Sequence, residues 1–305
     1  MEESMDGRII SFILRAMKQF LLVGLAFIFF IFKADAQPEN SYVFQGEFGV
    51  AAGVSQYFGD LNPDLHFNTP KMVVGIFFRK QLTDYIAVRI QGQFAKLGYS
   101  DTYNTQNAFY LRRNLSFNTN IWQLGLQGDF NFFRFIPGDG EHRSTPYLTI
   151  GIGMFSFDPY AYLDGQKYYL RELGTEGQGS PAYPDRKPYN NIAAFIPLGI
   201  GYKYNLNPKM NIGVELVYNF TTTDYLDDVS KTYAGINNFP TLPTGDPSVA
   251  ALLQDRSYET GSPPIGVQGR QRGYQNQNDG YLYLEVMFSF NLSTYRCPSP
   301  PTISR

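Results

Sequence analysis

The chain has few of the residues on which several common kinds of chemistry depend. Its 305 residues include one cysteine, Cys297, and two histidines, His66 and His142. A single cysteine cannot form an intramolecular disulfide. Basic residues are not in excess either, because 25 Lys and Arg stand against 27 Asp and Glu. The chain therefore lacks the basic footprint of a nucleic-acid-binding protein, and no nucleic-acid partner is expected.

One long apolar run is present, at the N-terminus, and it is typical of an export signal. Lys18 precedes "FLLVGLAFIFFIF", and the small-residue site at 34–36 invites cleavage after Ala36. We expect residues 1–36 to be an N-terminal extension and signal peptide, with Met17 as an alternative start. No cysteine lies near the cleavage site, so no lipoprotein anchor is expected. Downstream, no apolar run reaches the length of a membrane-spanning helix.

The rest of the chain is rich in aromatic residues and glycine, with 23 Tyr, 26 Phe and 29 Gly, a composition that favours strands over helices. Segments of roughly ten residues alternate between apolar and polar positions, the pattern expected of a transmembrane barrel. In 209–220, for example, a face with Ile212, Val214 and Leu216 opposes one with Asn211 and Glu215. We expect about eight strands, an even number as single-chain barrels require. Their ranges are 44–56, 71–80, 84–96, 120–132, 146–156, 192–204, 209–220 and 279–292.

The sequence thus predicts an all-β fold, an eight-stranded antiparallel outer-membrane barrel over residues 37–292, followed by a periplasmic C-terminal tail over 293–305. Charged residues within the strands fall on the polar face. Because a charge that faces lipid costs a few kcal/mol near the bilayer midplane, we expect these side chains inside the barrel. They are Glu47, Arg89, Asp129, Glu215 and Glu285.

The lengths of the connections between strands predict how the barrel is oriented in the membrane. Long and short connections alternate along the chain, as they should if the long loops lie outside the cell and the short turns in the periplasm. The longest loop spans 222–278. The alternative is a water-soluble β-sandwich or lipocalin-like barrel with its apolar face inward. The export signal, the aromatic residues and the Phe-rich final strand favour the membrane.

A barrel of this size is filled by its own side chains, so an open pore is not expected and function moves to the loops and edges. An acid/His hydrolase at the outer rim would need His66 with nearby aspartates, because His142 falls on the opposite membrane face. A cation site, such as one for Ca²⁺, would need Asp224, Asp227 and Asp228, although their spacing does not match an EF-hand loop. For all three aspartates a structural rim is the preferred interpretation. We expect no enzymatic activity, no cofactor and no small-molecule substrate.

Two segments at strand ends stand out as a pair. "YFGDLNP" follows the first strand and "DYLDDVS" the seventh, and the chain also contains "FDP" at 157–159 and a closing "NDGYLYLEVMFSFNL". The residues of the two segments are Tyr57, Phe58, Gly59, Asp60, Leu61, Asn62 and Pro63, and Asp224, Tyr225, Leu226, Asp227 and Asp228. Together these stretches resemble the PorG family of outer-membrane barrels associated with the type IX secretion system of Bacteroidetes-type bacteria.

The resemblance covers nearly all of the mature chain and implies a non-enzymatic accessory component of that secretion machine. Its partners would be outer-membrane lipid and the periplasmic ring, which a lipoprotein and its partner protein build. The family offers no catalytic residues to carry over. The two best-matched segments point outward in the expected topology, away from the ring, so they brace the rim, meet another outer-membrane component, or indicate an inverted orientation. A free-standing barrel for surface ligands or adhesion is the alternative, with a rim hydrolase third.

Overall fold

The computed structural model describes residues 42–137 and 139–295. The expected signal peptide and most of the expected tail lie outside these residues. Eight long strands form the barrel: β1 (Tyr42–Phe58), β2 (Lys71–Gln81), β3 (Ile86–Ser100), β4 (Ser116–Asn131), β5 (Ser144–Ser156), β8 (Ile192–Asn207), β9 (Met210–Thr221) and β10 (Gly280–Tyr295). β10 runs three residues past the expected boundary at 292.

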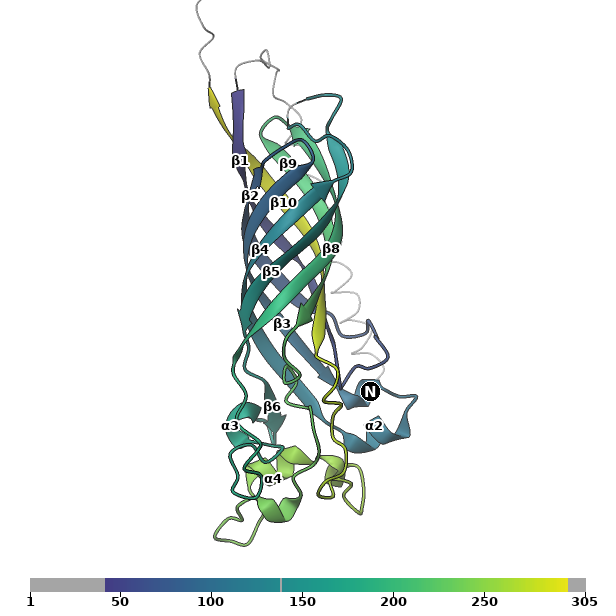
Figure 1. The fold of residues 1–305 in the computed structure, drawn as a ribbon. Helices are drawn as coiled ribbons and strands as arrows, with labels where there is room; N and C mark the ends of the chain where they lie inside the picture. The colour runs from purple at the N-terminus through teal and green to yellow at the C-terminus, as the bar shows by residue number, and fades with distance from the viewer. Residues whose placement is uncertain (1–41, 138, 296–305) are drawn as a thin grey trace, which may run out of the picture. The chain divides into compact units, whose positions relative to one another are not determined.

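The strands close on themselves into an antiparallel barrel. Each pairs with its neighbour along the chain, β1 pairs with β10, and the pairing of β3 with β4 completes the ring. The expected barrel is therefore confirmed, with eight strands wound around one interior (Figure 1). No helix among the described residues is long and apolar enough to cross a membrane.

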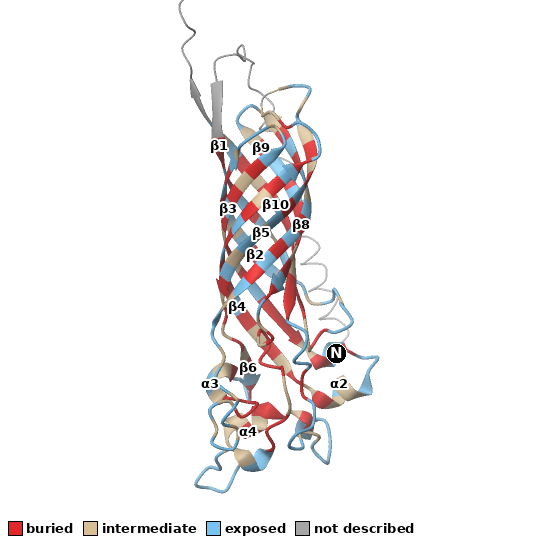
Figure 2. Cartoon of the chain, in the orientation of Figure 1, coloured by how far each residue is buried: buried red, intermediate tan, exposed pale blue. Residues whose placement is uncertain are grey.

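Side chains alternate between the interior and the outer face, because successive residues of a strand point to opposite sides of the sheet. Figure 2 shows this alternation along the barrel wall. On β4 the apolar residues Trp122, Leu124 and Leu126 are exposed outward, while Gln123 and Gln127, which alternate with them, are buried inside. The barrel thus has an apolar outer face and a polar interior, the arrangement of an outer-membrane barrel rather than of a water-soluble one.

Aromatic side chains mark both edges of the apolar outer face. Towards one end, Phe94 and Trp122 pair across β3 and β4 with ring centroids 4.7 Å apart. The next outward pair, Lys96 and Asn120, is polar, so the apolar face ends there. Towards the other end, Phe130 and Phe132 form a similar aromatic contact. Such belts are typical of the two membrane–water interfaces.

The connections alternate between the two ends of the barrel, and the three longest of them lie at the same end. The turns 82–85, 132–143 and 208–209 lie at one end, here called the short-turn end. The loops 59–70, 101–115, 157–191 and 222–279 gather at the other, the long-loop end (Figure 1).

The long loops contain regular elements as well as irregular segments. They contain the hairpin of β6 (Tyr160–Leu163) and β7 (Gln166–Tyr169) and several helical turns. The helical turns are η1 (Asp101–Tyr103), α2 (Ala108–Arg113), α3 (Leu170–Leu173), η2 (Ile236–Asn238), α4 (Val249–Gln254) and η3 (Ser257–Glu259). Side-chain caps explain two of the helices: Asn107 accepts a hydrogen bond from the first turn of α2, and Ser248 does so for α4.

Candidate functional site

The five charged residues expected inside the barrel are all buried there, and two cations that the sequence analysis missed join them. Arg79 bridges Glu47 at 2.6 Å and Asp129 at 2.7 Å, and Arg89 pairs with Glu215 at 2.8 Å. Lys203 is also buried in the interior. Arg79 was missed because Lys80 follows it directly, so alternation alone does not say which of the two points inward.

Glu285 differs from the other interior acids. It lies directly across from Glu215 on the paired strands β9 and β10, and no Lys or Arg of the described residues forms an ion pair with it. Its carboxyl instead accepts a hydrogen bond from Gln93 at 2.7 Å. Like charges directly opposite one another on paired strands are destabilising, so the pair of Glu285 and Glu215 is unfavourable when both carry charge.

Aromatic side chains fill much of the remaining interior. Phe77, Tyr147, Phe155, Tyr281 and Tyr283 are each at most 2% exposed. At the short-turn end Phe135, also 2% exposed, is held by the amide of Gln81, which donates to its carbonyl oxygen at 2.7 Å. The interior is thus packed, as expected for eight strands, and offers structural rigidity rather than a passage.

At the long-loop end, the two segments that stood out in the sequence meet. The hydroxyl of Tyr57 lies 2.6 Å from Oδ2 of Asp227, 170 residues away along the chain, and 2.9 Å from Oδ1 of Asp279. A side chain at Gly59 would collide with Asp279 and Tyr57, which explains the glycine. Asn62 shapes the loop by donating to the carbonyl oxygens of Tyr57 and His66. We call Tyr57, Asp227 and Asp279 the loop junction.

The loop junction contains more acceptors than one phenol can serve. All three side chains are at most 2% exposed. The remaining oxygens of the two carboxyls accept backbone N–H groups, from Val229 for Asp227 and from Leu226 for Asp279, both at 2.9 Å. Tyr57 has one proton and can donate to one carboxyl only. The other carboxyl must therefore carry a proton and donate it to the phenol oxygen.

The electrostatics agree with a protonated carboxyl. Burial raises the pKa of Asp227 well above its ordinary value, and the nearby charge of Asp279 raises it further. Burial likewise raises the pKa of Asp279, with Asp224 as the strongest neighbouring charge. Among the described residues, no Lys or Arg forms an ion pair with either carboxyl.

Asp224 and Asp228 lie beside the loop junction but have other surroundings. Burial raises the pKa of Asp224 to about 8, and its contact with Ser230 only partly opposes this. Asp228 adopts a left-handed backbone conformation with φ 66° and accepts hydrogen bonds from Tyr189, at 2.8 Å, and from Thr175. Burial raises its pKa to about 6 against the opposing charge of Arg272.

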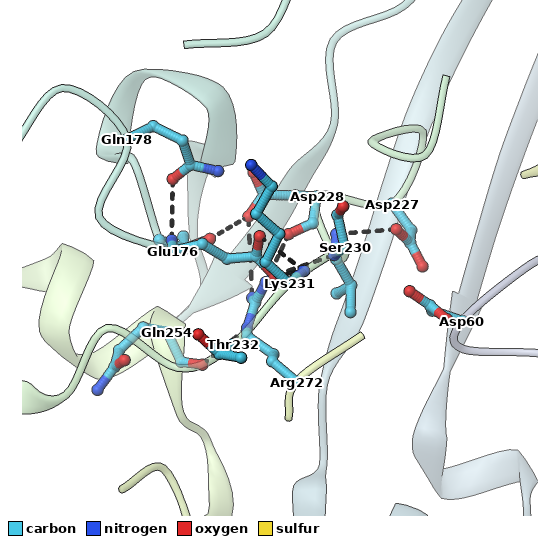
Figure 3. Close-up of polar contacts among 12 residues, drawn as sticks. Asp60, Glu176, Gln178, Asp227, Asp228, Ser230, Lys231, Thr232, Gln254 and Arg272 are labelled. Carbon is cyan, nitrogen blue, oxygen red and sulfur yellow. Dashed lines mark hydrogen bonds and ion pairs between the residues drawn. The ribbon is translucent and has the colours of Figure 1, made fainter. Parts of the chain in front are cut away.

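Arg272 connects the two longest loops. Its guanidinium donates to Glu176 at 3.2 Å and to the carbonyl oxygen of Asp228. Glu176 in turn accepts the backbone N–H groups of Ser230 and Lys231, at 2.9 and 3.0 Å. Figure 3 shows these side chains converging from loops 157–191 and 222–279.

The three aspartates for which a structural rim is the preferred interpretation lie at the long-loop end, and their side chains are buried there. Asp224, Asp227 and Asp228 are buried, between 0 and 8% exposed, and the contacts of Asp227 differ from those of Asp228. Tyr225 is the second residue of the segment and stacks on Tyr189 with ring centroids 4.5 Å apart, while Leu226 is fully buried. Within the described part of the chain, no group of three or more His, Cys, Asp or Glu side chains is arranged to hold a metal ion.

The histidines do not form a catalytic dyad. His142 contacts Asp139 at 2.6 Å in the turn 132–143, at the short-turn end. His66 lies in loop 59–70 at the other end, and none of the described acids is hydrogen-bonded to its ring. The nearby acid Asp60 instead accepts the backbone N–H of Tyr274 at 2.9 Å.

Comparison with known proteins gives a family. The sequence profile of a family described as "Domain of unknown function (DUF6089)" matches residues 23–245. The chain belongs to this DUF6089 family. No curated protein sequence matches it significantly.

Solved outer-membrane proteins resemble this DUF6089 protein only distantly. Ail, the attachment invasion locus protein of Yersinia pestis, solved with the heparin analogue sucrose octasulfate, is 10% identical with a TM-score of 0.37, over 81% of this chain and 99% of that one. Neisserial surface protein A is 10% identical with a TM-score of 0.38, over 81% and 97%. OprG of Pseudomonas aeruginosa is 9% identical with a TM-score of 0.34, over 83% and 96%. Such scores support no inference from those proteins to this one.

Proposed function

We propose that this DUF6089 protein is a non-enzymatic outer-membrane component of the type IX secretion system, which links the periplasmic ring to the outer membrane. The observation that carries the proposal is the packed interior, because a barrel filled by charged and aromatic side chains provides surfaces and anchorage rather than transport. The assignment to the type IX secretion system rests on the resemblance of the two strand-end segments to the PorG family.

The short-turn end is the surface that we assign to the ring lipoprotein and its partner. In the expected orientation it faces the periplasm, and it exposes apolar side chains: Leu82 is 59% and Phe133 63% exposed. Beside them, Arg134 and Asp84 form an exposed ion pair at 2.7 Å. Apolar anchors with a polar border are typical of protein interfaces. The expected tail would add to this surface, but it falls largely outside the described residues.

Affinity purification from detergent-solubilised outer membrane tests the proposal. We expect the tagged protein to recover the ring lipoprotein and its partner, and Phe133→Ser to reduce that recovery. Phe67→Ser is the matched control, because Phe67 is equally exposed, at 68%, but lies at the long-loop end. Absence of ring subunits from a folded barrel would exclude the secretion role, as would undisturbed type IX secretion after deletion of the gene.

A second candidate function is the binding of surface ligands or adhesion partners. The ordered long loops favour it, because the loop junction and Arg272 fix them into one defined surface. In that case deletion of the gene would remove the binding of a ligand or adhesion partner to whole cells, while type IX secretion would continue. A rim hydrolase is the least supported, since His66 has no acid partner among the described residues.

A further inference from the structure

A pocket of about 390 Å³ opens at the long-loop end, where three loops meet. Its lining includes Asp60 and Pro63 from loop 59–70, Phe109 and Tyr110 from α2, and Tyr274 from loop 222–279. Its volume lies within the range of about 300–1,000 Å³ that ligand pockets occupy. The pocket combines aromatic walls with one acidic side chain.

Asp60 is the acid in the lining without a cationic partner. Its carboxylate accepts the backbone N–H of Tyr274 at 2.9 Å, and no Lys or Arg of the described residues forms an ion pair with it. Behind it lie the buried carboxyls of Asp227 and Asp279, which also have no such partner. Because one of those two carboxyls carries a proton, the negative charge on this side of the pocket comes from Asp60 and from the other carboxyl behind it.

Two arginines contribute to the wall, but both are already engaged. Arg113 donates to the two oxygens of Asp101, each at 2.7 Å, and to the carbonyl oxygen of Asp60 at 2.9 Å. Arg272 is directed to Glu176. Both arginines are at most 3% exposed. An anionic ligand would have to break these buried pairs, which is costly.

The aromatic walls suit a cation. The guanidinium of Arg113 already lies 4.9 Å from the ring centre of Tyr110, so these rings attract a cation in the fold itself. Tyr274 is 52% exposed, and its own backbone N–H donates to Asp60, so its ring and the carboxylate lie near enough for one cation to contact both. At the rim, the amides of Gln271 and Gln277 are exposed and can bond to a peptide backbone.

We propose that this pocket binds a guanidinium or ammonium side chain presented by a polypeptide. The Asp60 carboxylate pairs with the positive charge, the Tyr274 ring covers it, and the rim amides contact the flanking peptide bonds. The site is independent of the secretion role, because its residues lie at the long-loop end, away from the surface assigned to the ring.

Calorimetric titration of the folded protein in detergent micelles tests the site with two blocked tripeptides, acetyl-Gly-Arg-Gly-amide and the same peptide with citrulline in place of arginine. Citrulline keeps the shape and removes the charge. We expect saturable binding of the arginine peptide and affinity weaker by about fivefold to tenfold for the citrulline peptide. Equal affinity for the two peptides, or no saturable binding of the arginine peptide, would overturn the proposal.

Substitutions in the lining test whether the arginine peptide binds in this pocket. Asp60→Asn keeps an oxygen to accept the N–H of Tyr274 but removes the charge, so it should weaken the arginine peptide by a similar factor and leave the citrulline peptide unchanged. Tyr274→Leu should weaken the arginine peptide as well, with circular dichroism to verify the fold. Asp185→Asn, at an exposed aspartate outside the lining, is the control and should change nothing. Undiminished binding in a folded Asp60→Asn protein would contradict the assignment.

Discussion

Replacing Asp279 by Asn should fix the loop junction in its protonated form. The asparagine oxygen can still accept the N–H of Leu226, and its NH₂ group can donate to the phenol oxygen of Tyr57, leaving the phenol proton for Asp227. The variant thus reproduces the hydrogen bonds of the protonated wild type. The hydrogen bonds of the variant therefore do not depend on the pH at which a carboxyl becomes protonated.

The sign of the pH effect follows from the raised pKa values. The ordinary value for Asp is 3.8, and the folded pKa of Asp227 and Asp279 lies well above it, so the closed loops bind more protons than the open loops. The resulting stability is complete below about pH 4 and is lost as the pH rises through the folded pKa. An unpaired buried charge costs about 3–5 kcal/mol, which sets the upper limit of the loss.

Hydrogen exchange at the backbone N–H groups of Leu226 and Val229 reports the opening, because these groups donate to the two carboxyls. After correction for intrinsic exchange rates, wild-type protection should be complete near pH 4 and should fall as the pH rises through the raised pKa of the two carboxyls. In Asp279→Asn the fall should be smaller by about tenfold, equivalent to about 1.4 kcal/mol. Asp185→Asn is the control. An equal fall in wild type and Asp279→Asn would refute the shared proton.

Three further predictions concern the interior, a close approach and the membrane face. Glu285→Gln should leave the free energy of unfolding in detergent within about 1 kcal/mol of wild type, because Gln93 can still bond to it. Glu215→Gln should cost about 3 kcal/mol, because it removes the nearer of the two carboxylates that pair with the buried Arg89; equal losses in the two variants would contradict this difference. Gly59→Ala should destabilise the closed loop junction by about 1–3 kcal/mol, because the added methyl group collides with Asp279 and Tyr57. Hydrogen exchange at the backbone N–H of Leu226 measures the loss, and protection equal to that of wild type would contradict the prediction. Brominated lipids should quench the fluorescence of Trp122, the single Trp and 65% exposed on the outer face, and unquenched emission in a folded, reconstituted barrel would place that face away from lipid.

The barrel could be predicted from the sequence because strand geometry repeats every two residues. Trp122, Leu124 and Leu126 face outward and Gln123 and Gln127 inward, as alternation requires. The same rule places Glu215 and Glu285 in the interior. It says nothing of which inward charges pair, and it is ambiguous where two charges are consecutive, as at Arg79 and Lys80.

The loop junction could not be predicted, because long-range contacts between loops have no period. Asp279 is 222 residues from Tyr57, and nothing in the local sequence relates the two. Asp227 and Asp228 lie just after a strand, where aspartates are usually solvated, and were therefore expected at the rim. The neighbours Leu226 and Val229, both at most 1% exposed, are the local sign that this segment turns inward.

Site-specific photo-crosslinking in the native outer membrane tests the central functional claim most directly. A photoreactive residue at position 133, at the short-turn end, should form crosslinks to the periplasmic ring lipoprotein or its partner. The same residue at position 274, at the long-loop end, should form none. Crosslinks to the ring from position 274, or none from position 133 in a cell that secretes normally, would contradict the proposed link between ring and barrel.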